Sequence, residues 1–278
     1  MSDIEFKTVL VTGATDGLGQ GVVRELARRG ATVLVHGRHR ARAEALAFEL
    51  RQAGAHAVRV YLADLASLAD VRALAAAVLE HEQRLDVLVN NAGIGTTVPT
   101  PDRAESADGI ELRFAVNYLS HYLLTRELLP LLERSAPARI VNVSSIGQQA
   151  IDFSDPMITR GYSGGRAYCQ SKLAQVMATL DLAAQLAPRN VTVTALHPAT
   201  YMPTKIVPNP ISTLEEGVNA TLRLIADEAL EGVTGKFFDG TRERRADAQA
   251  YDAKARAELH ALSERLVDKP TQRGLGGY

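Results

Sequence analysis

The segment Thr8-Val-Leu-Val-Thr-Gly13-Ala-Thr-Asp-Gly17-Leu-Gly19 decides the interpretation of the whole chain. Residues 8–12 form a short apolar run, which is typical of a buried parallel strand. A helical pattern follows directly and ends at residues 28–30, two arginines and a glycine, which favour a helix stop. Glycines between a strand and a helix let the backbone approach a phosphate, and the helix N-terminus offers free N–H groups. The segment therefore predicts a pyrophosphate-binding turn, with an ordinary tight turn as the alternative; its candidate ligands are Gly13, Thr15, Asp16, Gly17, Leu18 and Gly19.

Strand and helix patterns alternate along most of the remaining chain. Apolar runs of strand length occupy residues 32–36, 56–61, 86–90, 139–143, 191–196 and 236–238. Helical patterns cover residues 41–53, 68–82, 109–133, the stretch after Tyr168, 214–227 and 245–266. Such alternation predicts a parallel sheet with helices on both faces. We expect one doubly wound α/β domain over residues 1–278 with about seven strands, in which a core of about 7–240 precedes a helical extension of about 241–278.

Composition excludes several classes of function. The chain has 278 residues and a formal net charge of -1, which gives no reason to expect nucleic acid or an anionic membrane as a partner. The single cysteine, Cys169, permits no intrachain disulfide and suits a reducing compartment. The first residues are acidic and do not form a signal peptide, and no apolar run reaches the ~20 residues of a membrane span. The histidines lack metal-ligand spacing. We expect a cytoplasmic protein without a metal site.

Two strand ends carry residues that fit a dinucleotide. In such folds an acidic residue after the second strand holds the ribose 2′-hydroxyl, whereas a basic one suits a 2′-phosphate. Here Arg38 occupies that place, so NADP(H) is favoured and NAD(H) stays possible. Arg40 and Arg42 are alternative ligands, and any of the three could instead be a solvated charge at a helix start. After the third strand, Asp64, followed by Leu65, could accept from the adenine amino group or cap the next turn.

Amide side chains stand at the fourth strand end and in the long helix that follows. Asn90 and Asn91 precede Ala92 and Gly93, and asparagine side chains bond neighbouring backbone groups. We interpret them as support beneath a cofactor. Asn117 lies among apolar residues and needs a hydrogen-bond partner there.

Tyr168 and Lys172 are four residues apart and share one face of a predicted helix. A fixed positive charge near a phenol lowers its pKa and makes it a usable proton donor and acceptor near neutral pH. The pair alone also occurs by chance on surface helices. Cys169, next to the tyrosine, is interpreted as an ordinary helix residue.

Taken together, these residues resemble the short-chain dehydrogenase/reductase family, which has a Rossmann-type fold. The resemblance covers approximately residues 7–240, and the Asn-Val-Ser-Ser and Ala-Tyr-Cys-Gln-Ser-Lys-Leu segments are similar to the retinol-dehydrogenase-like branch. Members of that branch often have an N-terminal membrane anchor, which we do not expect here. Family members commonly form dimers or tetramers through the helices that carry Asn117 and Tyr168, so a homodimer or homotetramer is expected.

The resemblance also implies roles for individual residues. Tyr168 would be the general acid/base, Lys172 would lower its pKa and hold the nicotinamide ribose, and Ser145, not Ser144, would bond the substrate oxygen. Asn117 would hold a water of a proton relay. The implied cofactor contacts also include Asn91, Ala92, Gly93, Pro198, Thr200 and Thr204. Ala199 replaces the usual glycine after Pro198, and Thr204 falls one place later than the family pattern.

The expected activity is hydride transfer between NADP(H) and a lipophilic ketone, aldehyde or secondary alcohol. The alternative is a nucleotide-binding regulatory or scaffold protein that has lost its chemistry. The lipophilic substrate is inferred from two loops whose apolar side chains would line a pocket or else pack on each other; these are Phe153, Met157, Tyr162, Tyr201, Met202 and Ile206.

Overall fold

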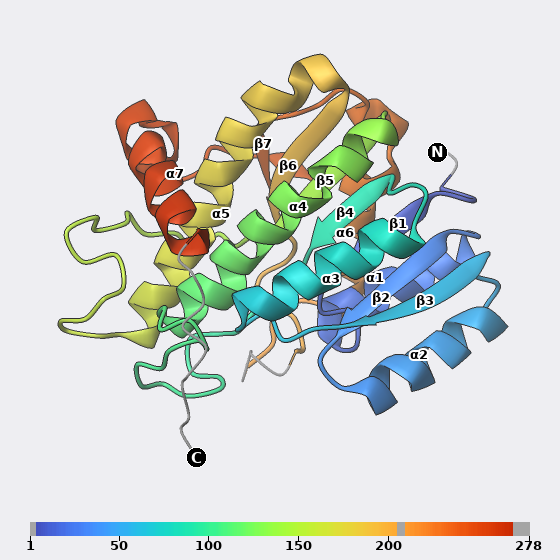
Figure 1. Cartoon of the computed structure of the whole chain (residues 1–278), viewed down its shortest axis with the longest axis horizontal. Helices are drawn as coiled ribbons and strands as arrows, with labels where there is room; N and C mark the ends of the chain where they lie inside the picture. Colours follow the sequence, from blue (N-terminus) through green and yellow to red (C-terminus); the bar gives the residue numbers. More distant parts are fainter. Residues whose placement is uncertain (1–3, 205–208, 269–278) are drawn as a thin grey trace.

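A computed structural model of the chain, which describes residues 4–204 and 209–268, contains one sheet of eight strands in the order β3-β2-β1-β4-β5-β6-β7-β8 (Figure 1). The first seven strands are parallel, and β8 pairs antiparallel with β7. This confirms the predicted doubly wound α/β class. The strands are β1 Thr8–Val11, β2 Thr32–Gly37, β3 Ala57–Leu62, β4 Val87–Asn90, β5 Ala138–Val143, β6 Val191–His197, β7 Lys236–Asp239 and β8 Arg242–Glu243.

Helices cover both faces of the sheet, and each face has its own apolar core. On one side the core includes residues of α3, α4 and α5, and on the other it includes residues of α1, α2 and α6. Consecutive buried strand residues alternate between the two cores, as Val9 and Leu10 of β1 do. The α-helices are α1 Gly17–Arg28, α2 Arg40–Gln52, α3 Leu68–His81, α4 Ser120–Arg134, α5 Gly164–Leu186, α6 Leu214–Ala226 and α7 Ala253–Val267.

The strand order reverses between β1 and β4, which are neighbours in the sheet although two strands separate them in sequence. Ligands of open α/β sheets bind outside the carboxyl ends of the strands at such a switch point. The glycine turn follows β1, and the Asn-Asn-Ala-Gly segment includes the end of β4. Both predicted halves of a nucleotide site therefore meet at this edge.

Three elements differ from the sequence prediction. The eighth strand, β8, has two exposed charged residues and no apolar signal, and it forms by turning at Gly240, whose φ is +57°. The predicted 109–133 helix instead contains a π-helical segment, Phe114–Leu119, before α4. The predicted terminal helix 245–266 starts later, because Asp252 caps α7 by accepting from the Lys254 and Ala255 amides.

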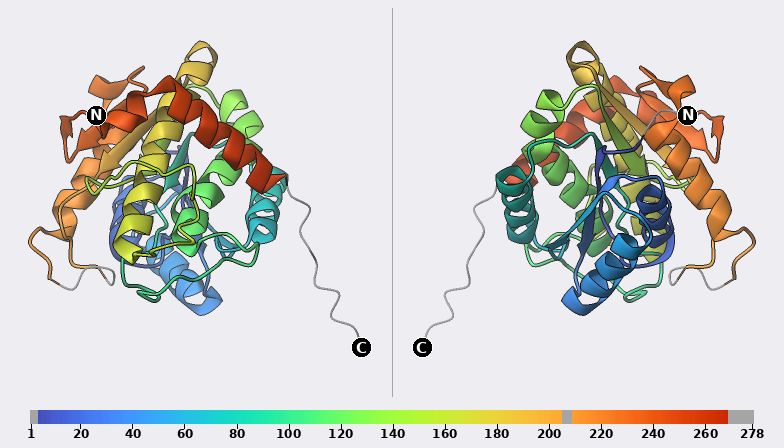
Figure 2. Two further views of the ribbon diagram at one scale, coloured as in Figure 1. Left: turned by 90° about the vertical axis from the view of Figure 1, so that its left-hand side faces the viewer. Right: turned by 90° about the vertical axis from the view of Figure 1, so that its right-hand side faces the viewer.

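The last helix, α7, lies across α5 and α4 (Figure 2). The Tyr118 hydroxyl, in the π-helical segment, is 2.7 Å from the Ser263 hydroxyl of α7. Arg126 of α4 forms an ion pair with Glu264 at 3.1 Å. The outer side of the two longest helices is thus covered by the chain itself. Within residues 4–204 and 209–268, no helix has the length and apolarity to cross a membrane.

Candidate active site

The glycine turn after β1 is so closely packed that side chains are excluded at two positions. A Cβ at Gly13 would lie 2.9 Å from Ala92 Cα, and one at Gly19 would lie 2.3 Å from the Gly13 carbonyl oxygen. Gly13 and Gly17 also have positive φ, +63° and +49°, which favours glycine. Asp16 caps α1 by accepting from the Gly17 amide at 2.9 Å. The turn thus presents bare backbone at a helix N-terminus, which fits a pyrophosphate.

Residues at and after the end of β4 hold the glycine turn in place through hydrogen bonds to Thr12. The Asn91 side-chain amide donates to Thr12 O at 2.8 Å, and Thr12 Oγ1 accepts from the Asn91 and Ala92 amides at 2.9 and 3.0 Å. Asn90 donates to Thr125 Oγ1 and Asn142 Oδ1. The interpretation of both asparagines as structural support therefore agrees with their contacts.

His36, at the end of β2, fixes the same turn, a role that the sequence did not reveal. Its Nδ1 accepts from the Gly13 amide at 3.1 Å, and its Nε2 is 3.2 Å from the Ala63 carbonyl oxygen. The ring is 2% exposed, and burial lowers its pKa to about 4. His36 is therefore neutral at pH 7, with the proton on Nε2.

Acidification from pH 6.5 to 4 should remove up to roughly 3 kcal/mol of folding free energy through His36, at about 1.4 kcal/mol per pKa unit. In this window the unfolded chain binds a proton at this histidine and the folded chain does not, so stability falls as pH falls. Urea unfolding from pH 7 to 4 measures the effect. His36→Asn, which keeps an acceptor for Gly13, should flatten the pH dependence, and exposed His39→Asn should not. Identical pH slopes for His36→Asn and the parent protein would contradict this role.

The predicted nucleotide ligands at the next two strand ends lie near each other. Arg38 Nη1 is 3.9 Å from Asp64 Oδ1, and both side chains are about half exposed or more. Asp64 also accepts from the Ala66 amide at 3.0 Å, so it does cap the following turn. Leu65 is buried in the core, as is Leu18 of α1. Thr15 packs on Gly37, where a Cβ would lie 2.6 Å from its methyl group.

The four predicted catalytic side chains lie close together near Gly93, and they are Asn117, Ser145, Tyr168 and Lys172. A Cβ at this exposed glycine would lie 3.3 Å from Asn117 Oδ1 and 3.6 Å from Lys172 Nζ. Asn117 accepts from the Ile94 amide at 2.8 Å and donates to Ser171 Oγ at 3.0 Å. Lys172 Nζ is 5.8 Å from the centre of the Tyr168 ring. Ser145 and Tyr168 both lie beside Gly147, where a Cβ would be 3.5 Å from Ser145 Oγ and 3.9 Å from Tyr168 Cε1.

The charge state of Tyr168 differs from the sequence prediction. Burial raises its pKa, and the hydrogen bond from Ser145 opposes this only in part. In the free protein the Lys172 ammonium donates to Val143 O and Gln175 Oε1, each at 2.9 Å, and not to the Tyr168 hydroxyl. Burial lowers the pKa of Lys172 itself to about 7. At neutral pH the tyrosine is therefore a protonated phenol that can donate.

Of the low-specificity candidates after β6, Thr204 comes close to the glycine turn. A Cβ at Gly17 would lie 3.1 Å from its methyl group. Thr200 Oγ1 is 3.0 Å from His197 Nε2, and Pro198 lies between these two residues in sequence. The Thr200 hydroxyl therefore contacts the last residue of β6.

Among the described residues, the apolar side chains of the two loops that were predicted to line one pocket pack on different cores. Phe153 and Met157 pack on the core that includes α5, whereas Met202 packs on the opposite core, beside Gly217, where a Cβ would lie 2.1 Å from its Sδ. Tyr201 is 60% exposed, and Ile206 lies outside the described residues. Tyr162 uses its hydroxyl in a polar contact with Glu111 at 2.9 Å. These side chains are therefore divided between two cores and the polar contact of Tyr162 with Glu111.

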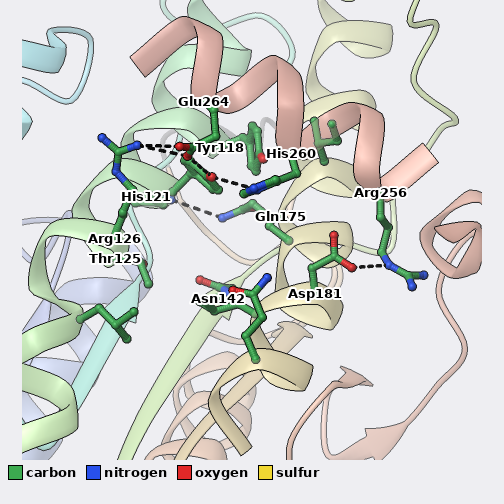
Figure 3. A pocket seen from close by; sticks show the side chains of 16 residues that line it. Tyr118, His121, Thr125, Arg126, Asn142, Gln175, Asp181, Arg256, His260 and Glu264 are labelled. Carbon is green, nitrogen blue, oxygen red and sulfur yellow. Dashed lines mark hydrogen bonds and ion pairs between the residues drawn. The ribbon is translucent and has the colours of Figure 1, made fainter. Parts of the chain in front are cut away.

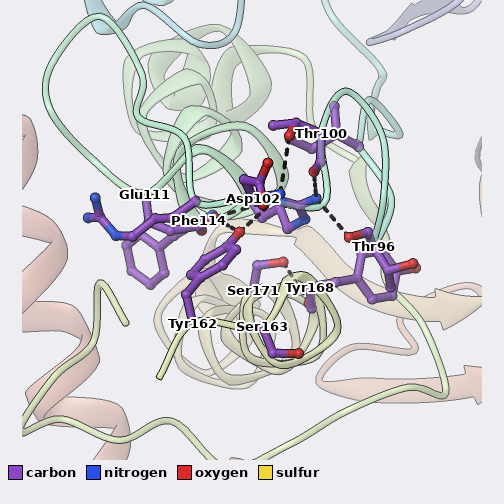
Figure 4. A network of polar contacts seen from close by, with 12 residues as sticks. Thr96, Thr100, Asp102, Glu111, Phe114, Tyr162, Ser163, Tyr168 and Ser171 are labelled. Atoms are coloured by element: carbon purple, nitrogen blue, oxygen red, sulfur yellow. Dashed lines mark hydrogen bonds and ion pairs between the residues drawn. The ribbon is translucent and has the colours of Figure 1, made fainter. Parts of the chain in front are cut away.

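That polar contact, between Tyr162 and Glu111 (Figure 4), belongs to a cluster around Arg113, a charged residue that is fully buried. Its guanidinium donates to Tyr162 OH at 2.7 Å and lies 3.8 Å from Glu111. It also donates to three carbonyl oxygens of the loop after β4, those of Gly95, Thr96 and Thr100. Arg113 thereby joins this loop to the start of the Tyr168 helix. The sequence feature that could have predicted this buried role is the position of Arg113 between two apolar residues, Leu112 and Phe114.

Comparisons with known proteins agree with this geometry. The short chain dehydrogenase family matches residues 7–213. Retinol dehydrogenase 13 of Homo sapiens is 39% identical, over 94% of this chain and 84% of its own length. A short chain dehydrogenase from Shigella flexneri complexed with NADP superposes with a TM-score of 0.70 at 26% identity, covering 86% of this chain and 99% of that one. A 3-ketoacyl-(acyl-carrier-protein) reductase from Brucella melitensis complexed with NADH gives 0.68 at 28% identity, covering 85% and 97%.

The resemblance to the retinol-dehydrogenase-like branch is therefore confirmed, and the Cβ-free turn fits the dinucleotide that both solved relatives hold. This chain belongs to the short-chain dehydrogenase/reductase family and is an oxidoreductase that acts on alcohol and carbonyl groups with a nicotinamide dinucleotide.

Proposed function

We propose that the protein reduces a lipophilic ketone or aldehyde with NADPH, or oxidises the corresponding alcohol, using Tyr168 as general acid/base. The observation that supports this most strongly is the position of Lys172 Nζ, which is 5.8 Å from the centre of the Tyr168 ring and lies with Asn117 beside the exposed Gly93. A bound nicotinamide dinucleotide supplies the hydride. The names of the curated relatives, retinol dehydrogenases, support a lipophilic substrate, because retinol is a lipophilic alcohol.

The protein side of the proposed reaction is stabilisation of a growing negative charge. When a carbonyl carbon receives hydride, its oxygen becomes basic, and donors already aimed at it stabilise the transition state more than the ground state. Ser145 and Tyr168 are those donors, and Tyr168 gives up its proton. The raised pKa of Tyr168 keeps the phenol protonated at neutral pH but makes it a weaker acid, so its proton transfer requires a neighbouring charge that stabilises the phenolate. Lys172 then lies next to the phenolate and can stabilise it when charged.

The proposal is tested by fluorescence titration with NADPH and NADH, followed by a panel of lipophilic ketones and aldehydes in the same samples. Tight NADPH binding followed by its oxidation supports the whole proposal. Binding without any turnover across the panel contradicts the substrate class, and absence of binding of either nucleotide contradicts the cofactor site.

Arg38→Leu should weaken NADPH binding about 10- to 100-fold and leave NADH binding unchanged. A hydrogen bond to a charged group contributes about 1.5–3 kcal/mol, and NADH has no 2′-phosphate to lose. Arg38 is more than half exposed just after β2, and its Nη1 forms a long ion pair of 3.9 Å with Asp64. Dissociation constants for both nucleotides measure the effect. Arg42→Leu, at an exposed position in α2, is the control; a selective loss there instead would assign the 2′-phosphate to Arg42.

Assembly and location are part of the same proposal. The protein is proposed to form a homodimer or homotetramer. Because α7 packs on the outer side of α4 and α5, a subunit interface formed there must include α7 or displace it. Light scattering tests this, and a single peak at 29.9 kDa overturns it. A cytoplasmic location is supported by the single cysteine, and cell fractionation tests it.

A further inference from the structure

Lys172 is held by two neutral acceptors, one of which is a side chain that the family pattern of Tyr168 and Lys172 does not include. The ammonium is 5% exposed and donates to the Val143 carbonyl oxygen and to Gln175 Oε1, each at 2.9 Å. Gln175 lies three residues after Lys172 on α5, so both side chains share one helix face. A buried ammonium without enough acceptors is disfavoured relative to the neutral amine. The Gln175 oxygen therefore favours the protonated lysine.

Gln175 belongs to a buried polar chain, which we define as Thr12, His121, Gln175 and Lys172. Gln175 Nε2 is 3.3 Å from His121 Nδ1, and His121 Nε2 is 3.2 Å from Thr12 Oγ1. His121 Nδ1 is also 3.1 Å from the Asn117 carbonyl oxygen, so Gln175 donates to Nδ1 only in the tautomer that carries its proton on Nε2. His121 is 3% exposed, and burial lowers its pKa to about 3, so the ring is neutral. Thr12 also holds the amides beneath the glycine turn. The buried polar chain thus links the nucleotide-binding turn to Lys172.

On its other side Gln175 lines a cavity of about 250 Å³ between α4, α5 and α7 (Figure 3). The titratable groups that face this region are Tyr168 and Asp181 on α5, His121, Tyr122 and Arg126 on α4, Tyr118 before it, and Arg256, His260 and Glu264 on α7. Asp181 and Glu264 pair with Arg256 and Arg126. The cavity carboxylates are thus neutralised by arginines, and the cavity leaves space for a substituted side chain at position 175.

We propose that Gln175 is a positioning residue for Lys172, whose amide oxygen holds the ammonium, in its protonated form, beside Gly93 and the Tyr168 ring. The proposal rests on the proposed function, because it assigns Gln175 to the support of that site. Loss of the oxygen leaves Val143 O as the remaining protein acceptor, which favours the neutral amine. A carboxylate in the same place would favour the ammonium.

The test is the pKa of Lys172 itself, measured by NMR titration of ¹³C-lysine-labelled protein without nucleotide or substrate. The Lys172 signal is identified as the one missing from Lys172→Arg. We expect the pKa of Lys172 to fall by about 1 in Gln175→Leu and to rise by at least as much in Gln175→Glu, from the strength of a hydrogen bond to a charged group. Gln185→Leu, an exposed glutamine on α5 that lines the same cavity, should leave it unchanged.

An unchanged Lys172 pKa in folded Gln175→Leu and Gln175→Glu proteins would overturn the inference. If the leucine variant does not fold, the glutamate variant decides alone, since it keeps size and polarity. The readout needs no turnover, so it stands whether or not the proposed reaction is found. Where turnover is available, the pH profile of kcat should shift in the direction of the lysine pKa while the KM for NADPH changes less than threefold.

Discussion

Arg113→Met is expected to lower the free energy of unfolding by about 3–5 kcal/mol, because it leaves a buried carboxylate without its cation. Arg113 and Glu111 are 0% and 1% exposed. Glu111 would keep the Phe114 amide and the Tyr162 hydroxyl as donors, at 2.7 and 2.9 Å, but no positive charge from Arg113. The three carbonyl oxygens of the loop after β4 would also lose their donor. Both losses act in the same direction.

Urea unfolding at pH 7 measures this effect, with Arg103→Met as the matched control. Arg103 pairs with Glu105 at 2.6 Å in the same region, but the carboxylate is half exposed, and such pairs contribute about 0–1 kcal/mol. Tyr162→Phe should cost less than Arg113→Met, about 1–3 kcal/mol, because it removes one hydroxyl between the two charges. Equal, small losses for Arg113→Met and Arg103→Met would show that the buried cluster does not stabilise the fold.

The sequence could predict the sheet because each buried parallel strand coincides with an apolar run of three to six residues between turn residues. Each predicted run overlaps one of the seven parallel strands to within about two residues. The glycine turn was predictable for a related reason, since a Cβ at Gly13 or Gly19 would collide with backbone, and no other residue type is compatible with those contacts. Features that depend on neighbouring residues in the sequence, such as apolar strands and glycine turns, can therefore be predicted without knowledge of the fold.

Contacts between distant segments could not be predicted in the same way. The Arg113 guanidinium bonds Tyr162, 49 residues away, and His36 bonds the amide of Gly13, 23 residues away. Nothing local to Tyr162 distinguishes a pocket wall from a partner of a buried charge, and the apolar assignment failed for that reason. The pKa of Tyr168 was predicted in the wrong direction because it depends on burial and on where Lys172 Nζ points, which the four-residue spacing does not state.

Tyr168→Phe should reduce turnover by about 10²- to 10⁴-fold, the range that a positioned general acid or base contributes. Phenylalanine keeps the ring and removes the hydroxyl, so the substrate oxygen would retain the Ser145 donor without a proton source. The fold should survive, since the aromatic ring is kept and Ser145 Oγ still accepts from the Gly147 amide at 3.0 Å. NADPH affinity should change by less than threefold, because the glycine turn and Arg38 are untouched.

Steady-state kinetics on any carbonyl that the panel identifies, together with NADPH titration, separates the chemical step from cofactor binding. Tyr122→Phe is the control: its hydroxyl donates to Glu264 at 2.5 Å between α4 and α7, away from Ser145, so turnover should stay at the parental level. Ser145→Ala should lower turnover less than Tyr168→Phe, because it removes a donor and leaves the proton source in place. If Tyr168→Phe binds NADPH normally and retains parental turnover, the proton comes from another group, and the assignment of Tyr168 as general acid/base is wrong.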